Sequence, residues 1–272
     1  GVDATTWRGA TALVTGASRG LGRVIAEGLA REGMALILVA RDASQLEETR
    51  AACEAAGAQA RALPCDLGQE ASRRALVEAA GPIDVLVNNA GVEVPVALLD
   101  QRDEDVDRQV TTNLVAPIDL TRRFLPGLKG RPRAAIVNVS SMSGKSPTPF
   151  NAIYAATKFG LNGFTASLRI ELEGTSVTTG VVCPSFVGGT GMWADTGLKA
   201  PLLMKEVPPQ RLVSAVLRVM NGAHEVLVTP SPVRPLLALG TLFPGLDGPV
   251  LRWIGVRSTL EARARRLAAR GG

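Results

Sequence analysis

Short apolar runs alternate along the chain with longer segments whose apolar residues recur at helical spacing. Most of the runs are continuous, which is typical of strands buried on both faces by helices. Strands that alternate with helices indicate βαβ units and a parallel sheet. The predicted strands are Ala12–Thr15, Ala35–Ala40, Ala60–Pro64, Val85–Asn88, Ala135–Ser140, Val177–Cys183 and Val226–Thr229.

The segments between these strands carry signals for the start and the end of helices. Ser44 is followed three residues later by Glu47, the spacing of a capping box, and Gly57 is placed to end the same helix. The predicted helices are Gly20–Glu32, Ser44–Ala56, Ala71–Ala80, Asp103–Phe124, Phe150–Glu173 and Pro209–Met220. Right-handed crossovers then give a single α/β domain of the doubly wound Rossmann type, with a seven-stranded, mostly parallel sheet and helices on both faces.

Residues 230–272 break this rhythm, because they are rich in Pro, Gly and Leu and end in the arginine-bearing segment Arg257–Arg270. We therefore assign residues 1–229 to a dinucleotide-binding and catalytic domain and residues 230–272 to a C-terminal extension. A helix at the end would set Arg263, Arg266 and Arg270 opposite Leu260, Ala264 and Leu267. Packing on the same domain or on a partner subunit is the favoured interpretation, and peripheral contact with a membrane surface is the alternative.

The amino-acid composition argues against several kinds of site and ligand. The chain has 272 residues, of which 46% are hydrophobic and 20% charged, so it can bury a core without a metal or disulfide. One histidine, three separated cysteines and no Cys-x-x-Cys pair argue against a metal site. The net charge of +5 permits contact with nucleic acid, an anionic membrane or a phosphorylated ligand and does not choose among them, but no motif supports nucleic-acid binding. Without a signal-like N-terminus or an apolar run of transmembrane length, we expect a cytoplasmic protein.

A glycine-rich segment joins the first predicted strand to the first helix. It reads Thr15-Gly16-Ala17-Ser18-Arg19-Gly20-Leu21-Gly22. Glycines in this position let the backbone approach a pyrophosphate, and the helix that follows presents its N–H groups and its positive dipole end to the anion. The order strand, glycine turn, helix therefore predicts a dinucleotide site.

The end of the second predicted strand indicates which dinucleotide is bound. Selectivity for NAD usually needs a carboxylate here, and the chain has Ala40 followed by Arg41. Arg41 and Arg19 are placed to bind a 2′-phosphate, whereas Asp42 lies past the strand end, where it begins the next turn. We therefore expect NADP(H) as cofactor.

The only tyrosine of the chain, Tyr154, lies four residues before Lys158, so that a helix would bring the two side chains together. A neighbouring ammonium favours the phenolate, and we expect it to lower the tyrosine pKa toward neutrality. Ser140 and Ser141 lie at the carboxyl end of a predicted strand and would open into the crevice where such sheets bind ligands. A hydroxyl there is placed to hydrogen-bond a substrate carbonyl.

Over nearly all of residues 11–229, these motifs resemble the classical short-chain dehydrogenase/reductase family. The resemblance rests on Gly16, Gly20 and Gly22, on Asp66-Leu67, on Asn88-Asn89-Ala90-Gly91, on Asn113, and on Ser141, which is 13 residues before Tyr154, with Lys158. It implies dinucleotide contacts from Gly16, Ser18, Arg19, Gly20, Leu21, Gly22, Arg41, Asp66, Leu67, Asn89, Ala90, Gly91, Tyr154, Lys158, Pro184, Val187 and Thr190.

The resemblance also implies the catalytic roles. Tyr154 is the general acid in reduction and the base in oxidation, Ser141 polarises the carbonyl, and Lys158 binds the nicotinamide ribose. Asn113 holds a water that extends a proton relay. The family's Pro-Gly-x-Val-x-Thr sequence is altered here, since Ser185 replaces the glycine and Thr190 falls one residue late.

These observations predict an oxidoreductase that transfers a hydride between NADP(H) and a carbonyl or secondary alcohol. The apolar residues of the segment 188–207 favour a lipophilic small-molecule substrate. The alternative is a non-enzymatic NADP-sensing or scaffold protein on the same fold, because a fold alone does not define a function. We expect a homo-oligomer, either a dimer or a tetramer.

Overall fold

The computed structural model describes residues 5–185, 187, 206–230, 234–243, 245, 249 and 256–268. Its seven strands form one sheet in the order β3-β2-β1-β4-β5-β6-β7, in which all neighbouring strands pair in parallel. The strands are β1 (Thr11–Thr15), β2 (Ala35–Ala40), β3 (Ala60–Pro64), β4 (Val85–Asn88), β5 (Ala134–Val139), β6 (Val177–Pro184) and β7 (Glu225–Val228). The Rossmann-type prediction is confirmed, and β1 and β4 flank the point where the strand order reverses.

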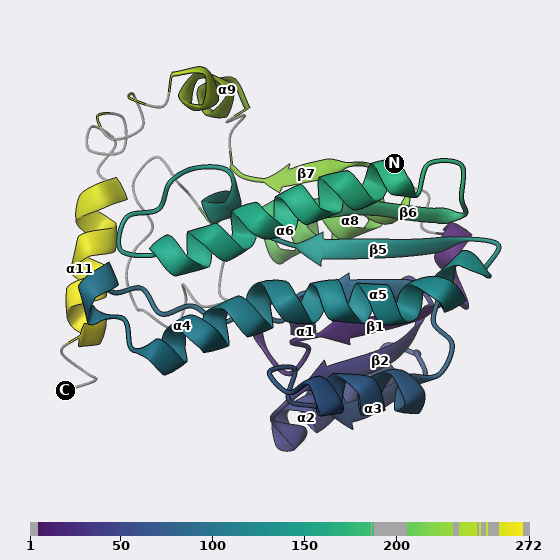
Figure 1. The fold of residues 1–272 in the computed structure, drawn as a ribbon. Coiled ribbons are helices and arrows are strands. Elements are labelled where there is room, and N and C mark those ends of the chain that lie inside the picture. The colour runs from purple at the N-terminus through teal and green to yellow at the C-terminus, as the bar shows by residue number, and fades with distance from the viewer. Residues whose placement is uncertain are drawn as a thin grey trace.

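Helices cover both faces of this sheet (Figure 1). Alternate residues of a strand point to opposite faces, so Ala12 and Val14 of β1 pack in one apolar cluster and Leu13 packs in the other. The first cluster includes residues of α1 (Gly20–Arg31), α2 (Ala43–Ala55) and α8 (Pro209–Met220). The second includes residues of α3 (Glu70–Ala80), α5 (Ala116–Lys129) and α6 (Ala152–Glu171). Burial from both sides explains why the strands read as continuous apolar runs.

Two helix predictions need correction. The segment Asp103–Phe124 is not one regular helix, because α4 (Asp103–Val110) passes through a π-helical turn at Thr111–Val115 before α5 begins. Such turns are rare and frequently lie at functional sites. The N-cap of α2 is Asp42 and not Ser44, because the Asp42 carboxylate accepts a 2.9 Å hydrogen bond from Gln45 N.

The described part of the C-terminal extension contains α9 (Arg234–Leu242) and α11 (Val256–Ala268). The predicted two-faced pattern of α11 is wrong for Arg263, which is buried together with Leu260 and Ala264. The guanidinium of Arg263 lies on that face because it pairs with a buried carboxylate, Glu93. Short 3₁₀ helices lie at Thr5–Trp7, Leu98–Asp100 and Met142–Gly144.

In the part of the chain that the structure describes, no helix is both long enough and apolar enough to cross a membrane. The predicted cytoplasmic location stays a prediction, as do the boundaries of the domain and its extension.

Candidate active site

The glycine loop and the turn after β4 lie in close contact at the carboxyl end of the sheet. Gly16 has φ +66°, and a Cβ built on it would lie 2.8 Å from the Ala90 Cα. A Cβ on Gly22 would lie 2.0 Å from the Gly16 carbonyl oxygen, so neither position has room for a side chain. The predicted close approach of the backbone is therefore present.

Thr15 and Asn89 connect the two segments. The Thr15 hydroxyl oxygen accepts hydrogen bonds from the backbone N–H groups of Asn89 and Ala90, both at 3.0 Å. The Asn89 side chain donates to the Thr15 carbonyl oxygen at 3.1 Å. No side chain caps the first turn of α1 at Arg19, so the backbone N–H groups of that turn can bind an anion. The residues present thus fit a dinucleotide pyrophosphate.

The end of β2 has the charge expected for a phosphorylated ribose. Ala40 ends the strand, and Arg41 and Arg19 are both exposed. The Asp42 carboxylate is held as the N-cap of α2. This hydrogen bond therefore turns the Asp42 carboxylate toward the helix backbone.

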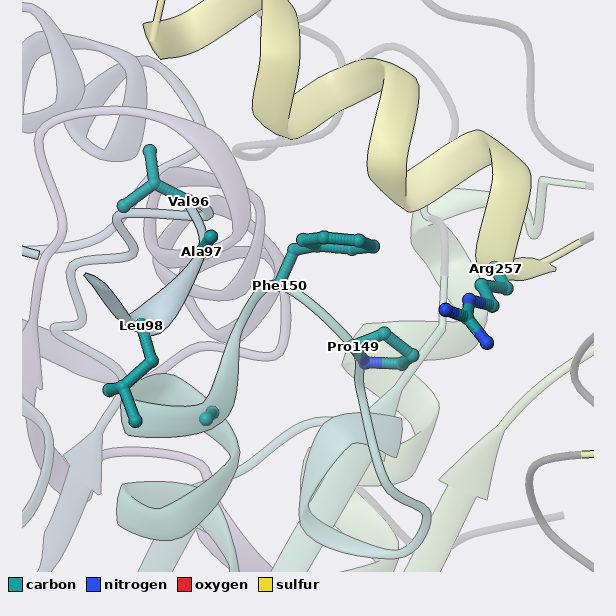
Figure 2. A pocket seen from close by; sticks show the side chains of 7 residues that line it. Val96, Ala97, Leu98, Pro149, Phe150 and Arg257 are labelled. Atoms are coloured by element: carbon teal, nitrogen blue, oxygen red, sulfur yellow. The ribbon is translucent and has the colours of Figure 1, made fainter. Parts of the chain in front are cut away.

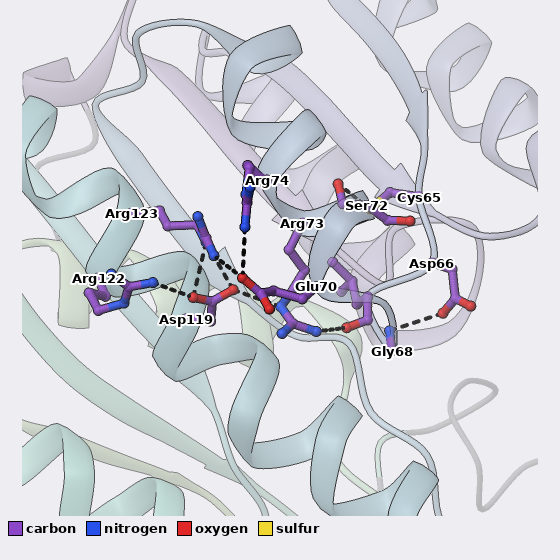
Figure 3. Close-up of polar contacts among 11 residues, drawn as sticks. Cys65, Asp66, Gly68, Glu70, Ser72, Arg73, Arg74, Asp119, Arg122 and Arg123 are labelled. Atoms are coloured by element: carbon purple, nitrogen blue, oxygen red, sulfur yellow. Dashed lines mark hydrogen bonds and ion pairs between the residues drawn. The ribbon is translucent and has the colours of Figure 1, made fainter.

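The turn after β3 is held by an ion pair that the sequence did not reveal (Figure 3). Asp66 is exposed and accepts a 2.9 Å hydrogen bond from Gly68 N. Arg73 donates to the Leu67 carbonyl oxygen at 2.7 Å and to Asp119 of α5 at 2.8 Å. Burial opposes ionisation of Asp119, but hydrogen bonds from its arginine neighbours outweigh burial and hold the Asp119 pKa well below its usual range.

Tyr154 and Lys158 lie together near the start of α6, and both side chains are buried. The Lys158 Nζ is 5.5 Å from the centroid of the Tyr154 ring and donates a 3.0 Å hydrogen bond to the Val139 carbonyl oxygen. The Ser141 hydroxyl is hydrogen-bonded to Tyr154. Ser140 instead donates to the Lys158 carbonyl oxygen at 3.3 Å, so the geometry favours Ser141 over Ser140 as the substrate-facing serine.

The pKa values of this pair differ from the expectation. Burial is the largest influence on the phenol and raises the Tyr154 pKa, and the Glu93 carboxylate raises it further. The hydrogen bond with Ser141 and the charge of Arg263 act in the opposite direction. Burial also lowers the Lys158 pKa to about 8. Burial thus raises the Tyr154 pKa, whereas we expected Lys158 to lower it toward neutrality.

Asn113 lies in the π-helical turn and is buried. Its amide group accepts a 2.8 Å hydrogen bond from Val92 N and donates to the Val92 carbonyl oxygen at 2.8 Å. It also donates to the Thr157 hydroxyl at 3.2 Å. The side chain therefore ties the loop after β4 to α6, one residue before Lys158.

The segment after β6 is described only in part. Pro184 ends β6 and Val187 forms a parallel bridge with Val207, whereas Thr190 lies outside the described residues. Ser185, which replaces the family's glycine, donates its hydroxyl to the Val228 carbonyl oxygen at 2.9 Å. The apolar residues of 188–205 that suggested a lipophilic substrate also lie outside the described part.

A cavity of about 430 Å³ opens beside the start of α6 (Figure 2). One lining residue, Ala152, is two positions before Tyr154 in the chain. The lining is apolar except for a single guanidinium, and it consists of Val96, Ala97, Leu98, Pro149, Phe150, Ala152 and Arg257. Phe150 has φ +60°, an unfavourable backbone conformation that is characteristic of functional sites when the surroundings enforce it.

Sequence reasoning missed three residues beside Tyr154. Arg263 of α11 forms a two-point ion pair with Glu93, and Asn151 donates a hydrogen bond to the same carboxylate. The one available signal was Glu93 itself, a lone acid between apolar residues directly after the Asn-Asn-Ala-Gly motif.

The family model for short chain dehydrogenases matches residues 10–200. The chain belongs to the short-chain dehydrogenase/reductase family. The chain is 40% identical over 270 residues to a curated relative, the ketoacyl reductase HetN of Nostoc sp. (strain PCC 7120). The alignment covers 96% of this chain and 94% of that protein. The identity thus includes the C-terminal extension.

Solved structures of the family superpose on this short-chain dehydrogenase/reductase. A metagenomic short-chain oxidoreductase in complex with NADP is 33% identical with a TM-score of 0.70, covering 84% of this chain and 99% of that chain. A family member from Burkholderia phymatum in complex with NAD is 26% identical with a TM-score of 0.78, covering 88% of this chain and 95% of that chain.

The protein is therefore an oxidoreductase that acts on CH–OH and C=O groups with a nicotinamide cofactor. The scaffold alternative is not favoured. Among the described residues, no group of three or more His, Cys, Asp or Glu side chains is arranged to hold a metal ion.

Proposed function

We propose that this short-chain dehydrogenase/reductase is an NADPH-dependent reductase of 3-oxoacyl thioesters and similar lipophilic ketones. The observation that carries the proposal is the Tyr154, Ser141 and Lys158 group next to an apolar cavity with one arginine at its edge. The relative that matches along nearly the whole chain is a ketoacyl reductase, which supports the same substrate class.

Each side chain has a defined task in this reaction. The Tyr154 hydroxyl donates a proton to the carbonyl oxygen, and burial, which raises its pKa, keeps the phenol protonated before the reaction. Ser141 orients the carbonyl by a hydrogen bond. Lys158 binds the nicotinamide ribose, and Asn113 fixes the loop after β4 against α6. The nicotinamide cofactor supplies the hydride when it is bound.

NADP(H) is proposed in preference to NAD(H). Arg41 and Arg19 offer two guanidinium groups where a 2′-phosphate would lie, and Asp42 is engaged as a helix cap. Guanidinium groups form strong, often bidentate hydrogen bonds with phosphate. The remaining dinucleotide contacts are proposed at the glycine loop, Asp66-Leu67, Asn89-Ala90-Gly91, Pro184, Val187 and Thr190.

The cavity beside α6 is proposed to take the acyl chain. Its apolar lining suits a hydrocarbon, and Arg257 at its edge suits an anionic carrier such as a phosphorylated pantetheine arm. In Figure 2 the Arg257 and Leu98 side chains lie on opposite sides of the cavity.

We also propose a homo-oligomer. Four apolar side chains are exposed on α4, the π-helical turn and α6: Val110, Val115, Phe159 and Ile170. Phe159 and Ile170 are three helical turns apart and lie on one face of α6. A second copy of the chain would cover them, and Phe159→Glu should lower the mass measured by light scattering.

The substrate proposal is tested by initial rates with acetoacetyl-CoA and with a neutral thioester of the same acyl group, each with NADPH and with NADH. We expect NADPH to be preferred, and we expect Arg257→Glu to raise KM for the CoA ester far more than KM for the neutral thioester. Equal effects on the two KM values would remove Arg257 from substrate binding. Lack of reduction of either thioester would refute the substrate class.

A further inference from the structure

Glu93 is a buried carboxylate in the loop after β4, two residues beyond Gly91. Its side chain is 9% exposed and that of Arg263 is 8% exposed. Arg263 donates to both carboxylate oxygens, at 2.7 and 2.8 Å, although 170 positions of sequence separate the two residues. A two-point ion pair fixes orientation as well as distance. The helix α11 is thereby attached to the loop that follows the Asn-Asn-Ala-Gly motif.

The same carboxylate also contacts the start of α6. Asn151, whose side chain donates to Glu93, is the last residue before this helix, and its carbonyl oxygen accepts a 2.9 Å hydrogen bond from Ala155 N. Tyr154 is only three residues further along. On the other side, the residue before Glu93 is Val92, whose backbone is held at both polar atoms by Asn113. Glu93 thus connects α11, the π-helical turn and the tyrosine-bearing turn of α6.

We propose that Arg263 is a positioning residue for the reaction: by pairing with Glu93 it balances a buried negative charge beside Tyr154 and fixes the turn that carries the phenol. The inference rests on the proposed role of Tyr154 as the proton donor. On this basis the C-terminal helix α11 contributes a residue that positions Tyr154 in the active site.

The charges around Tyr154 support this assignment. The charged and titratable groups near the phenol are Lys158 on α6, Cys183 on β6, Glu93 after β4 and Arg263 on α11. Burial raises the Cys183 pKa to about 12, so the thiol is neutral near pH 7. Glu93 raises the Tyr154 pKa and Arg263 lowers it. Removing Arg263 alone would leave an unbalanced buried carboxylate, which proteins tolerate poorly.

The test is the pH profile of kcat/KM for oxidation of a 3-hydroxyacyl thioester by NADP⁺, where Tyr154 must lose its proton. Arg263→Met should move the acid limb of the profile upward by about one unit or more, because the unbalanced carboxylate disfavours the phenolate. Glu93→Gln should move it downward. The double variant Glu93→Gln/Arg263→Met has no net charge change and should return the limb near its original place.

Two further variants separate this role from simple packing. Arg263→Lys keeps the charge and should restore most of the profile, whereas Arg265→Gln removes an exposed charge that pairs only locally, with Glu261, and should leave it unchanged. An unshifted limb in both Arg263→Met and Glu93→Gln would overturn the inference. Should Arg263→Met fail to fold, the opposite shift expected of Glu93→Gln still decides. Tyr154→Phe keeping full activity would instead refute the proposed function.

Discussion

The two walls of the active site are built in different ways. On the side of the glycine loop, the backbones after β1 and β4 approach closely, since a Cβ on Gly16 would lie 2.8 Å from the Ala90 Cα. On the side of α11, charged side chains from distant segments meet in a buried cluster around Glu93. The first wall depends on glycines, whose missing side chains let the backbones approach, and the second depends on the long side chains of Glu93 and Arg263.

This difference explains why the first wall can be predicted from the sequence and the second cannot. A backbone approach demands glycine at fixed spacing after a strand, and that demand can be read locally. An ion pair between Glu93 and Arg263 demands only that two charges arrive at one place, and neither residue has a distinctive neighbourhood. Substitutions in each part of the site should therefore change different quantities: turnover, cofactor affinity or the free energy of unfolding.

Tyr154, the proposed proton donor, should show the largest effect. Tyr154→Phe removes only the hydroxyl and keeps the buried ring, so we expect turnover to fall by about 10²–10⁴-fold. Binding of NADPH, followed by its fluorescence, should stay within about twofold, since no other dinucleotide contact changes. Unchanged turnover in steady-state assays would contradict the assignment of Tyr154.

The backbone wall is tested by Gly22→Ala. A Cβ there would lie 2.0 Å from the Gly16 carbonyl oxygen, so the loop must shift. We expect NADPH affinity to fall by about tenfold to a hundredfold, the equivalent of about 1–3 kcal/mol for overpacking. The matched control is Gly127→Ala in α5, where a Cβ would meet nothing within 4 Å. Equal affinity for the two variants would show that the close approach is unimportant.

Substitution of Arg41, at the end of β2, should have a smaller effect, on the preference for NADPH over NADH. Arg41→Ala should weaken NADPH by about tenfold, because a charge-assisted hydrogen bond is lost, and should change NADH binding little. Arg74→Ala, which removes an exposed arginine paired with Glu70, should change neither dissociation constant. If titration shows the same loss for NADPH and NADH, the assignment of the 2′-phosphate site is wrong.

The smallest effect concerns the helix cap beside that site. Asp42→Ala removes the carboxylate that accepts from Gln45 N and should lower the free energy of unfolding by about 1 kcal/mol. Ser44→Ala should be close to neutral, because Ser44 lies inside α2. Denaturant titration of both variants decides, and a greater loss for Ser44→Ala would restore the sequence-based cap.

Most of the sheet could be predicted from the sequence. The bounds of β2, β3 and β4 agree with the predicted segments. β2 and β4 are short, mostly apolar runs, whereas β3 is an edge strand that carries the exposed Arg61. The first residue of α1 was also predictable, since the glycine loop sets it.

The rest depends on tertiary contacts. Nothing local marks the π-helical turn at Thr111–Val115, whose effect is to aim Asn113 at Val92 and Thr157. Helical periodicity put Arg263 among solvent-facing arginines, but its partner Glu93 lies far away in sequence. Amphipathic patterning treats every charge as solvated and so misplaces a buried ion pair.

The π-helical turn between α4 and α5 has a consequence for how this segment can change over generations. A turn of this kind holds one residue more than a regular helical turn, and each residue of a helix rotates its successors by about 100°. Deleting a single position in Thr111–Val115 would swing α4 around its axis relative to α5 and turn the Asn113 amide away from both of its neighbours. A deletion in this segment is therefore expected to displace the Asn113 amide, whereas a substitution at another position of the turn keeps the segment length that places it.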